Sequence, residues 1–180
     1  MYGENEGFVG LMDLEQYVTA KFWLPGKPIP YPRMRKGMYG NMYNPASKEL
    51  KAARELLRDQ AKDFNEVGRQ IVENGLILPV TAILSVRVYL FMVPTKRGVV
   101  ELIKRNGGIP VLHTKRPDAD NLLKFVMDAG NGALWEDDEV VPWKVPVKFW
   151  APFEGTLISV TIPVDQEGHT WTTRFGVDFP

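Results

Sequence analysis

The pattern of apolar residues predicts several strands and two main helices. Apolar and polar side chains alternate over residues 17–24 and, more strongly, over residues 80–93, as expected of half-buried strands. Between these segments, apolar residues recur at helical spacing from Leu50 to Ile71. Asn44-Pro45 or Ser47 can begin this helix, and Asn74-Gly75 can end it.

The second half of the chain predicts shorter elements. We expect a short helix over residues 97–106, a short strand over 111–114 and the second main helix over 121–129. Beyond a turn at Asn131-Gly132, two more strands are expected. They occupy residues 140–148 and 156–164. The order indicates an α+β fold: a single domain with a mixed β-sheet and two main helices packed on it.

Composition is that of an ordinary globular protein. The 180 residues are 44% hydrophobic and 24% charged, and they include no cysteine, which excludes disulfides and thiolate ligands. We expect a domain over residues 17–163, flanked by an acidic N-terminal extension (1–16) and a C-terminal extension (164–180). The sequence has neither a basic-then-apolar leader nor an apolar run of ~18 residues. We therefore expect a cytoplasmic protein without membrane contact.

The net charge is zero, but the charges are unevenly distributed. Residues 21–62 contain ten Lys or Arg against three acids, and residues 96–124 contain seven against three. Basic segments of this kind can bind a phosphate backbone in a protein that is neutral overall.

The segment from Arg33 to Gly40 is basic, aromatic and interrupted by glycine, which predicts a mobile loop. One interpretation is a solvated connection. The other is a clamp on DNA, with cations on phosphates and aromatic rings on sugars or unstacked bases. The side chains of such a clamp are Arg33, Arg35 and Lys36, with Tyr31, Tyr39 or Tyr43.

Most of the candidate chemistry lies between Lys115 and Asp138. Lys115-Arg116 precedes Asp118-Ala119-Asp120-Asn121-Leu122-Leu123-Lys124, and the further acids Asp128, Asp137 and Asp138 follow. The two pairs Asp118/Asp120 and Asp137/Asp138 place four carboxylates in a small volume, and these repel one another unless cations bind among them. With no cysteine and with His113 far from His169, such a cation would bind oxygen ligands, as Mg²⁺, Mn²⁺ and Ca²⁺ do.

Simpler interpretations of these residues remain open. Asp120, Lys124 and Asp128 share one helix face, so they could form a surface ladder in which the lysine bridges two acids. Asp118 or Asp120 could cap the helix. An EF-hand is excluded because the required Gly and Glu positions are not matched, and no P-loop is present, so we expect no nucleotide cofactor.

The ordered set of residues resembles the RusA-type Holliday junction resolvases, most densely from Lys115 to Val141. This resemblance implies a homodimeric, Mg²⁺-dependent endonuclease, with Mn²⁺ able to substitute, that cuts four-way DNA junctions. It implies metal ligands at Asp118, Asp120 and Asp138, a catalytic Lys124, and supporting roles for Asp128 and Asp137. Lys115 and Arg116 would join the basic loop as DNA contacts. Val140 departs from the family, which usually has Gln there, and this puts one DNA or supporting contact in doubt.

Other functions of the same fold stay open at this point: a non-catalytic protein that binds branched DNA, or a nuclease acting on forks or flaps. A homodimer is expected because a four-way junction has two-fold symmetry and one chain supplies one acidic cluster. Aromatic residues near the C-terminal strands are candidates for the shared surface. They are Trp143, Phe149, Trp150 and Phe153.

Overall fold

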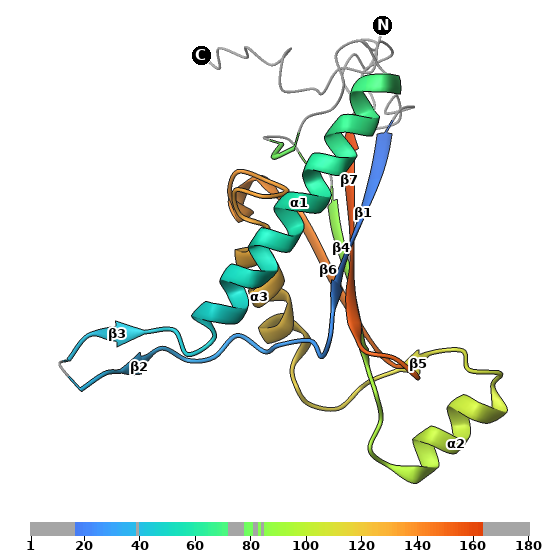
Figure 1. Ribbon diagram of the computed structural model, residues 1–180. Coiled ribbons are helices and arrows are strands. Elements are labelled where there is room, and N and C mark those ends of the chain that lie inside the picture. Colours follow the sequence, from blue (N-terminus) through green and yellow to red (C-terminus); the bar gives the residue numbers. More distant parts are fainter. Residues whose placement is uncertain (1–16, 39, 72–77, 81–82, 84, 164–180) are drawn as a thin grey trace, which may run out of the picture.

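A computed structural model describes residues 17–38, 40–71, 78–80, 83 and 85–163 (Figure 1). The expected extensions and Tyr39 lie outside these ranges, as does the expected helix end at Asn74-Gly75. The main sheet has five strands in the order β1-β7-β4-β6-β5. Their bounds are β1 Tyr17–Pro25, β4 Ser85–Met92, β5 Val111–Leu112, β6 Trp143–Trp150 and β7 Gly155–Pro163.

The sheet is mixed, as expected. β7 pairs antiparallel with β1 and β4, β5 pairs antiparallel with β6, and β4 runs parallel to β6. A parallel pair needs a long crossover connection. Here the crossover carries α2 (Arg97–Arg105), β5, α3 (Ala119–Gly130) and the 3₁₀ turn η1 (Asp138–Val140).

One face of the sheet is covered by α1 (Ser47–Ile71) and α3, which lie on the same side of it in Figure 1. Every second residue of the central strands points into the core beneath them, including Val88 and Ile158. The fully buried Trp135 packs in this core, and its indole Nε1 donates to Asn131 Oδ1 at 2.8 Å. This confirms the α+β architecture with two main helices on a mixed sheet.

Two arginines of α1 hold the C-terminal end of α3. Arg54 Nη2 donates to the carbonyl of Asp128 at 2.7 Å, and Arg58 Nε donates to the carbonyl of Gly132 at 3.3 Å. Guanidinium groups at the carbonyl end of a helix satisfy acceptors that the helix leaves free. These bonds tie the end of α3 to α1 and so fix the position of α3.

The opposite sheet face carries an aromatic cluster that no described helix covers. Phe91 has neighbouring rings on three sides, with centroid distances of 6.1 Å to Trp23, 5.6 Å to Phe149 and 5.1 Å to Phe153. Tyr89 stacks on Phe149 at 6.4 Å. We call these five residues the open-face cluster: Trp23, Tyr89, Phe91, Phe149 and Phe153.

The structure divides the aromatic group expected near the C-terminal strands. Phe149 and Phe153 belong to the open-face cluster, and Trp143 is exposed. Trp150 instead pairs with the buried Met92 and packs against the core under the helices. The expected strand over 140–148 runs from Trp143 to Trp150, so Phe149 and Trp150 alternate to opposite faces.

The segment after Pro32, expected to be a loop, contains short strands that the sequence did not predict. Arg35–Lys36 (β2) and Met42–Tyr43 (β3) pair as a short antiparallel ribbon, and Figure 1 shows this ribbon projecting away from the sheet. Gly37 N donates to Asn41 O at 2.7 Å across the ribbon, and Gly40 adopts a φ of 80°. The residues of both short strands are exposed, so the ribbon is held together by backbone hydrogen bonds across it.

Among the described helices, none has the length and apolar character needed to cross a membrane.

Candidate active site

The N-terminus of α3 presents the first two acids. Asp118 is the N-cap residue, with extended backbone at φ −68° and ψ 141°, but its side chain accepts no capping hydrogen bond. Asp120 follows in the first turn, and both residues are exposed. Capping therefore does not account for Asp118. Its carboxylate is available to a ligand, and the positive end of the α3 dipole favours negative charge beside it.

Lys124 and Asp128 continue along the same helix, but they do not form the surface ladder. No ion pair in the described residues joins Lys124 to Asp120 or Asp128. Lys124 Nζ instead lies 4.7 Å from the centre of the Tyr31 ring, a cation–π contact. The exposed ammonium group of Lys124 is thus held on the acidic side of α3 without a carboxylate to neutralise it.

Tyr31 connects the ribbon to α3. Its backbone N–H donates to the carbonyl of Asn121 at 2.9 Å. Burial raises the pKa of the Tyr31 hydroxyl, and the negative charge of the nearby Asp128 carboxylate raises that pKa further. Tyr31 is half-buried, and its backbone bond to Asn121 ties the segment before the ribbon to α3.

The second acidic pair reaches α3 through η1, which packs against that helix. Asp137 Oδ1 accepts a hydrogen bond from Glu139 N at 3.1 Å and so caps the 3₁₀ turn. Asp138 lies next, with its side chain 42% exposed and its Oδ2 3.5 Å from Lys144 Nζ. Trp135 is buried in the core just before this pair and so fixes the point at which the chain leaves the core.

Lys144 is a neighbour of the site that the sequence did not reveal. It comes from β6, six residues after Asp138, and is less exposed than its partner, at 29%. No periodicity relates a strand residue to a residue of the preceding turn, so only the fold brings the two together.

The predicted DNA contacts are all accessible. Lys115 and Arg116 are exposed immediately before Asp118, and Arg33, Arg35 and Lys36 are exposed on the ribbon. The backbone bond from Tyr31 to Asn121 ties the segment that leads into the ribbon to the helix that carries the acids. Basic groups therefore lie on the segment directly before Asp118 and on the ribbon, whose approach is tied to α3.

The donor chemistry fits a hard divalent cation, although no ready-made cage is present. Among the described residues, no group of three His, Cys, Asp or Glu side chains lies close enough to hold a metal ion. Mg²⁺ in phosphate-processing sites commonly uses only one or two carboxylates, together with water and substrate phosphate oxygens. Asp118, Asp120 and Asp138 supply carboxylates of this kind on two adjoining elements.

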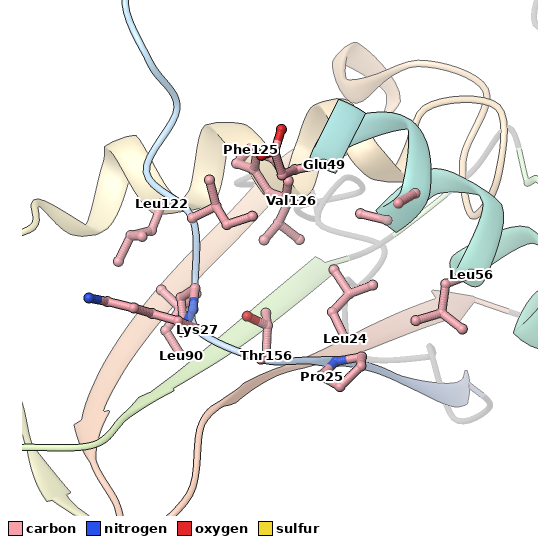
Figure 2. A pocket seen from close by; sticks show the side chains of 15 residues that line it. Leu24, Pro25, Lys27, Glu49, Leu56, Leu90, Leu122, Phe125, Val126 and Thr156 are labelled. Carbon is pink, nitrogen blue, oxygen red and sulfur yellow. The ribbon is translucent and has the colours of Figure 1, made fainter. Parts of the chain in front are cut away.

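A cavity of about 300 Å³ lies between the end of β1, the following Pro25–Ile29 segment, α1 and α3 (Figure 2). Its walls from α3 are Leu122, Phe125 and Val126, which lie on the buried side of the helix. None of the candidate site residues lines it. The cavity is therefore separate from the acidic site.

The match to known families agrees with this geometry. The chain matches the family model of endodeoxyribonuclease RusA over residues 25–161, a range that includes the ribbon, α3 and η1. Among curated proteins, no relative matches the chain. The family's nucleases are typically metal-dependent, and their substrate is DNA. The expected resemblance and the expectation of an enzyme are confirmed: the chain belongs to the RusA family of Holliday junction endodeoxyribonucleases, which hydrolyse phosphodiester bonds.

Proposed function

We propose that this chain cleaves four-way DNA junctions with the help of Mg²⁺ bound by Asp118, Asp120 and Asp138. One observation carries the proposal. The carboxylate of Asp118 stands at the N-terminus of α3 without a capping bond, in the same turn as Asp120, and the turn that bears Asp138 packs against this helix. Exposed acids at such a position repel DNA unless a cation lies between them and the phosphate.

When bound, Mg²⁺ would polarise the scissile phosphate and lower the pKa of an attacking water. The protein's own contribution is to bind and orient. Asp118, Asp120 and Asp138 direct their carboxylates from α3 and η1, while Asp137 holds η1 closed through its bond to Glu139. Asp128 is proposed to support the site from beside Tyr31, the residue whose ring lies under Lys124.

Lys124 is proposed as the catalytic cation. Its ammonium group is exposed, carries no carboxylate partner among the described residues, and is restrained over the Tyr31 ring. A positive charge fixed in this way neutralises the charge that grows on the phosphate in the transition state. The ribbon cations Arg33, Arg35 and Lys36, with Lys115 and Arg116, would contact flanking phosphates.

Replacement of the acids tests the metal site. Each of Asp118→Asn, Asp120→Asn and Asp138→Asn should lower Mg²⁺-dependent junction cleavage by ~100-fold or more, because each removes a charged ligand while keeping the side-chain size. Junction binding without metal should persist or strengthen, because one acid fewer repels phosphate. Cleavage of labelled four-way, forked and linear DNA would be followed for each variant and would also rank the substrates.

Asp59→Asn is a matched control, since Asp59 is an exposed aspartate on α1 that pairs with Lys62. It should cleave like the wild type. Wild-type rates in all three test variants would show that the metal site is assigned to the wrong residues.

Replacement of Lys124 tests the catalytic cation. Lys124→Ala should lower kcat by ~100-fold while junction affinity changes little, because a charge aimed at the transition state contributes little to ground-state binding. Single-turnover cleavage and binding would be measured on the same junction. Lys104→Ala, at an exposed lysine of α2, is the control. A loss of affinity with unchanged kcat would make Lys124 a simple phosphate contact.

We also propose that two copies of the chain pair through the open-face cluster. Phe153 is 45% exposed and Trp23 36% exposed, an unusual state for adjoining aromatic side chains on one sheet face. A C₂ pair would give the two matched sites that a two-fold symmetric junction requires. Trp150, half-buried on the other face, is left out of this surface.

A further inference from the structure

The chain segment that delivers Asp118 to α3 is tied down by β6. Lys148 Nζ donates two hydrogen bonds, each of 2.5 Å, to the backbone carbonyls of Lys115 and Pro117. Lys148 also offers its own carbonyl to His113 N at 2.9 Å. One residue of the sheet therefore holds three points of the five-residue approach to Asp118.

His113 adds a fourth tie to the same segment. It is 4% exposed, and its ring stacks on Trp150 with centroids 3.7 Å apart and an interplanar angle of 26°. Its Nδ1 accepts a hydrogen bond from Lys115 N at 3.0 Å. An Nδ1 that accepts a hydrogen bond carries no proton, so the proton of the neutral ring is on Nε2.

The ring is held in this neutral state. Burial lowers the pKa of His113, and the nearby Lys148 ammonium lowers that pKa further. Nε2 is buried, and no described residue bonds to it. Leaving a buried donor without a partner is unfavourable. The ring packs on Trp150 and accepts a hydrogen bond from Lys115 N. Of these two contacts, only the hydrogen bond requires a ring nitrogen, so the bond to the segment before Asp118 is the role that calls for a histidine.

We infer that Lys148 and His113 are positioning residues for the carboxylate of Asp118. The inference rests on the proposed function, in which Asp118 is a metal ligand. Lys148 fixes the carbonyl groups of Lys115 and Pro117. His113 fixes the start of the segment against Trp150. Together they determine the place at which the chain enters α3. Neither residue is proposed to touch substrate or metal.

Metal binding, measured without DNA, tests this role separately from catalysis. Lys148→Met keeps most of the side-chain volume and removes both carbonyl bonds. It should weaken Mn²⁺ binding by ~10- to 100-fold, the usual effect of losing a residue that orients a metal ligand. Titration of the full chain with Mn²⁺, followed by electron paramagnetic resonance, would give the affinity. Lys104→Met on α2 is the matched control and should bind Mn²⁺ like the wild type.

The histidine gives an independent pair of variants. His113→Leu removes the acceptor and should weaken Mn²⁺ binding in the same direction. His113→Asn keeps a short acceptor near the Nδ1 position and should retain more of the affinity. Should Lys148→Met fail to fold in a thermal melt, the comparison between these two variants decides the question.

The outcomes separate this inference from the proposed function. Wild-type Mn²⁺ affinity in Lys148→Met, alongside a loss in Asp118→Asn, would overturn the positioning role and leave the metal site standing. Wild-type affinity in Asp118→Asn would overturn the metal site itself. A third result would be unchanged Mn²⁺ affinity with a junction-binding salt slope that falls by ~1 unit. This would make Lys148 a phosphate contact and also overturn the inference.

Discussion

The two faces of the central sheet are built from the same strands but meet different surroundings. On one face, α1 and α3 bury Val88, Ile158 and their neighbours completely, and the acidic site stands on the outer side of α3. On the other face, Phe91 and the rings around it pack on each other with no described helix above them. The covered face thus holds the helix that carries the acids, and the open face leaves apolar surface exposed, as the proposed association requires. Alternation along a strand lets one sequence serve both needs.

The two faces of the sheet also differ in a glycine–tryptophan contact that each of them contains. A Cβ atom at Gly130 would overlap the ring of Trp135, which is fully buried under the helices. A Cβ atom at Gly155 would overlap the ring of Trp23, which is 36% exposed on the open face. At both positions a Cβ atom would require the neighbouring ring to move. The Trp135 ring is enclosed by the core, whereas the Trp23 ring has access to solvent.

The largest expected effect concerns association through the open face. Phe153→Asp places a charge in the open-face cluster and should weaken a dimer by ~100-fold or more, as loss of a central aromatic contact does. Metal affinity, which depends on the covered face, should not change. Sedimentation equilibrium at micromolar concentration would measure the dimer, and junction cleavage should shift from paired cuts to single nicks.

Leu102→Asp is the control for this variant, because Leu102 is an exposed apolar residue on α2, outside the cluster. It should leave the oligomeric state unchanged. A wild-type chain that is monomeric and fully active would refute the dimer, and a Phe153→Asp dimer of unchanged affinity would place its interface elsewhere.

The glycine pair is expected to give a smaller difference, in stability. Gly130→Ala should lower the free energy of unfolding by ~3 kcal/mol, because overpacking a buried ring forces backbone or rotamer shifts. Gly155→Ala should cost ~1 kcal/mol in the monomer, because Trp23 can turn outward. Urea unfolding of both variants would be compared on a monomeric background. Equal costs would mean that the open-face ring is as rigidly held as the core.

The smallest expected effect lies on the ribbon, which belongs to neither face. Arg33→Ala combined with Arg35→Ala should weaken binding to all DNA forms and reduce the salt slope by ~1 to 2 units, as expected for lost phosphate contacts. Fluorescence anisotropy at several salt concentrations would measure this slope. An unchanged slope would return the ribbon to a solvated connection without a DNA role.

The sequence predicted the covered face well, because its strands and α3 have clear apolar periodicity and the acids follow a recognisable order. It missed the ribbon because two-residue strands of exposed Arg, Lys, Met and Tyr have no apolar alternation to detect. It placed Trp150 with Phe149 because a shift of the strand boundary was enough to hide their opposite directions.

Contacts between distant residues were also beyond prediction. Lys148 reaches carbonyls that are 33 and 31 residues earlier in the chain, and backbone carbonyls carry no sequence signal. Lys124 lies over Tyr31, which is nearly a hundred residues away, so its freedom from Asp120 and Asp128 could be seen only in three dimensions.

The parallel pairing of β4 with β6 has a consequence for how the nuclease is made. Every proposed catalytic residue lies on the crossover between these two strands. Parallel pairing across so many residues closes a long loop, which is slow relative to local helix formation. A nascent chain that has emerged only as far as η1 already has every acid of the proposed site but lacks Lys144 and Lys148, which are part of β6. If these two lysines position the site as proposed, we expect cutting activity to arise only when the sheet is complete, so that an unfinished chain lacks an assembled nuclease site.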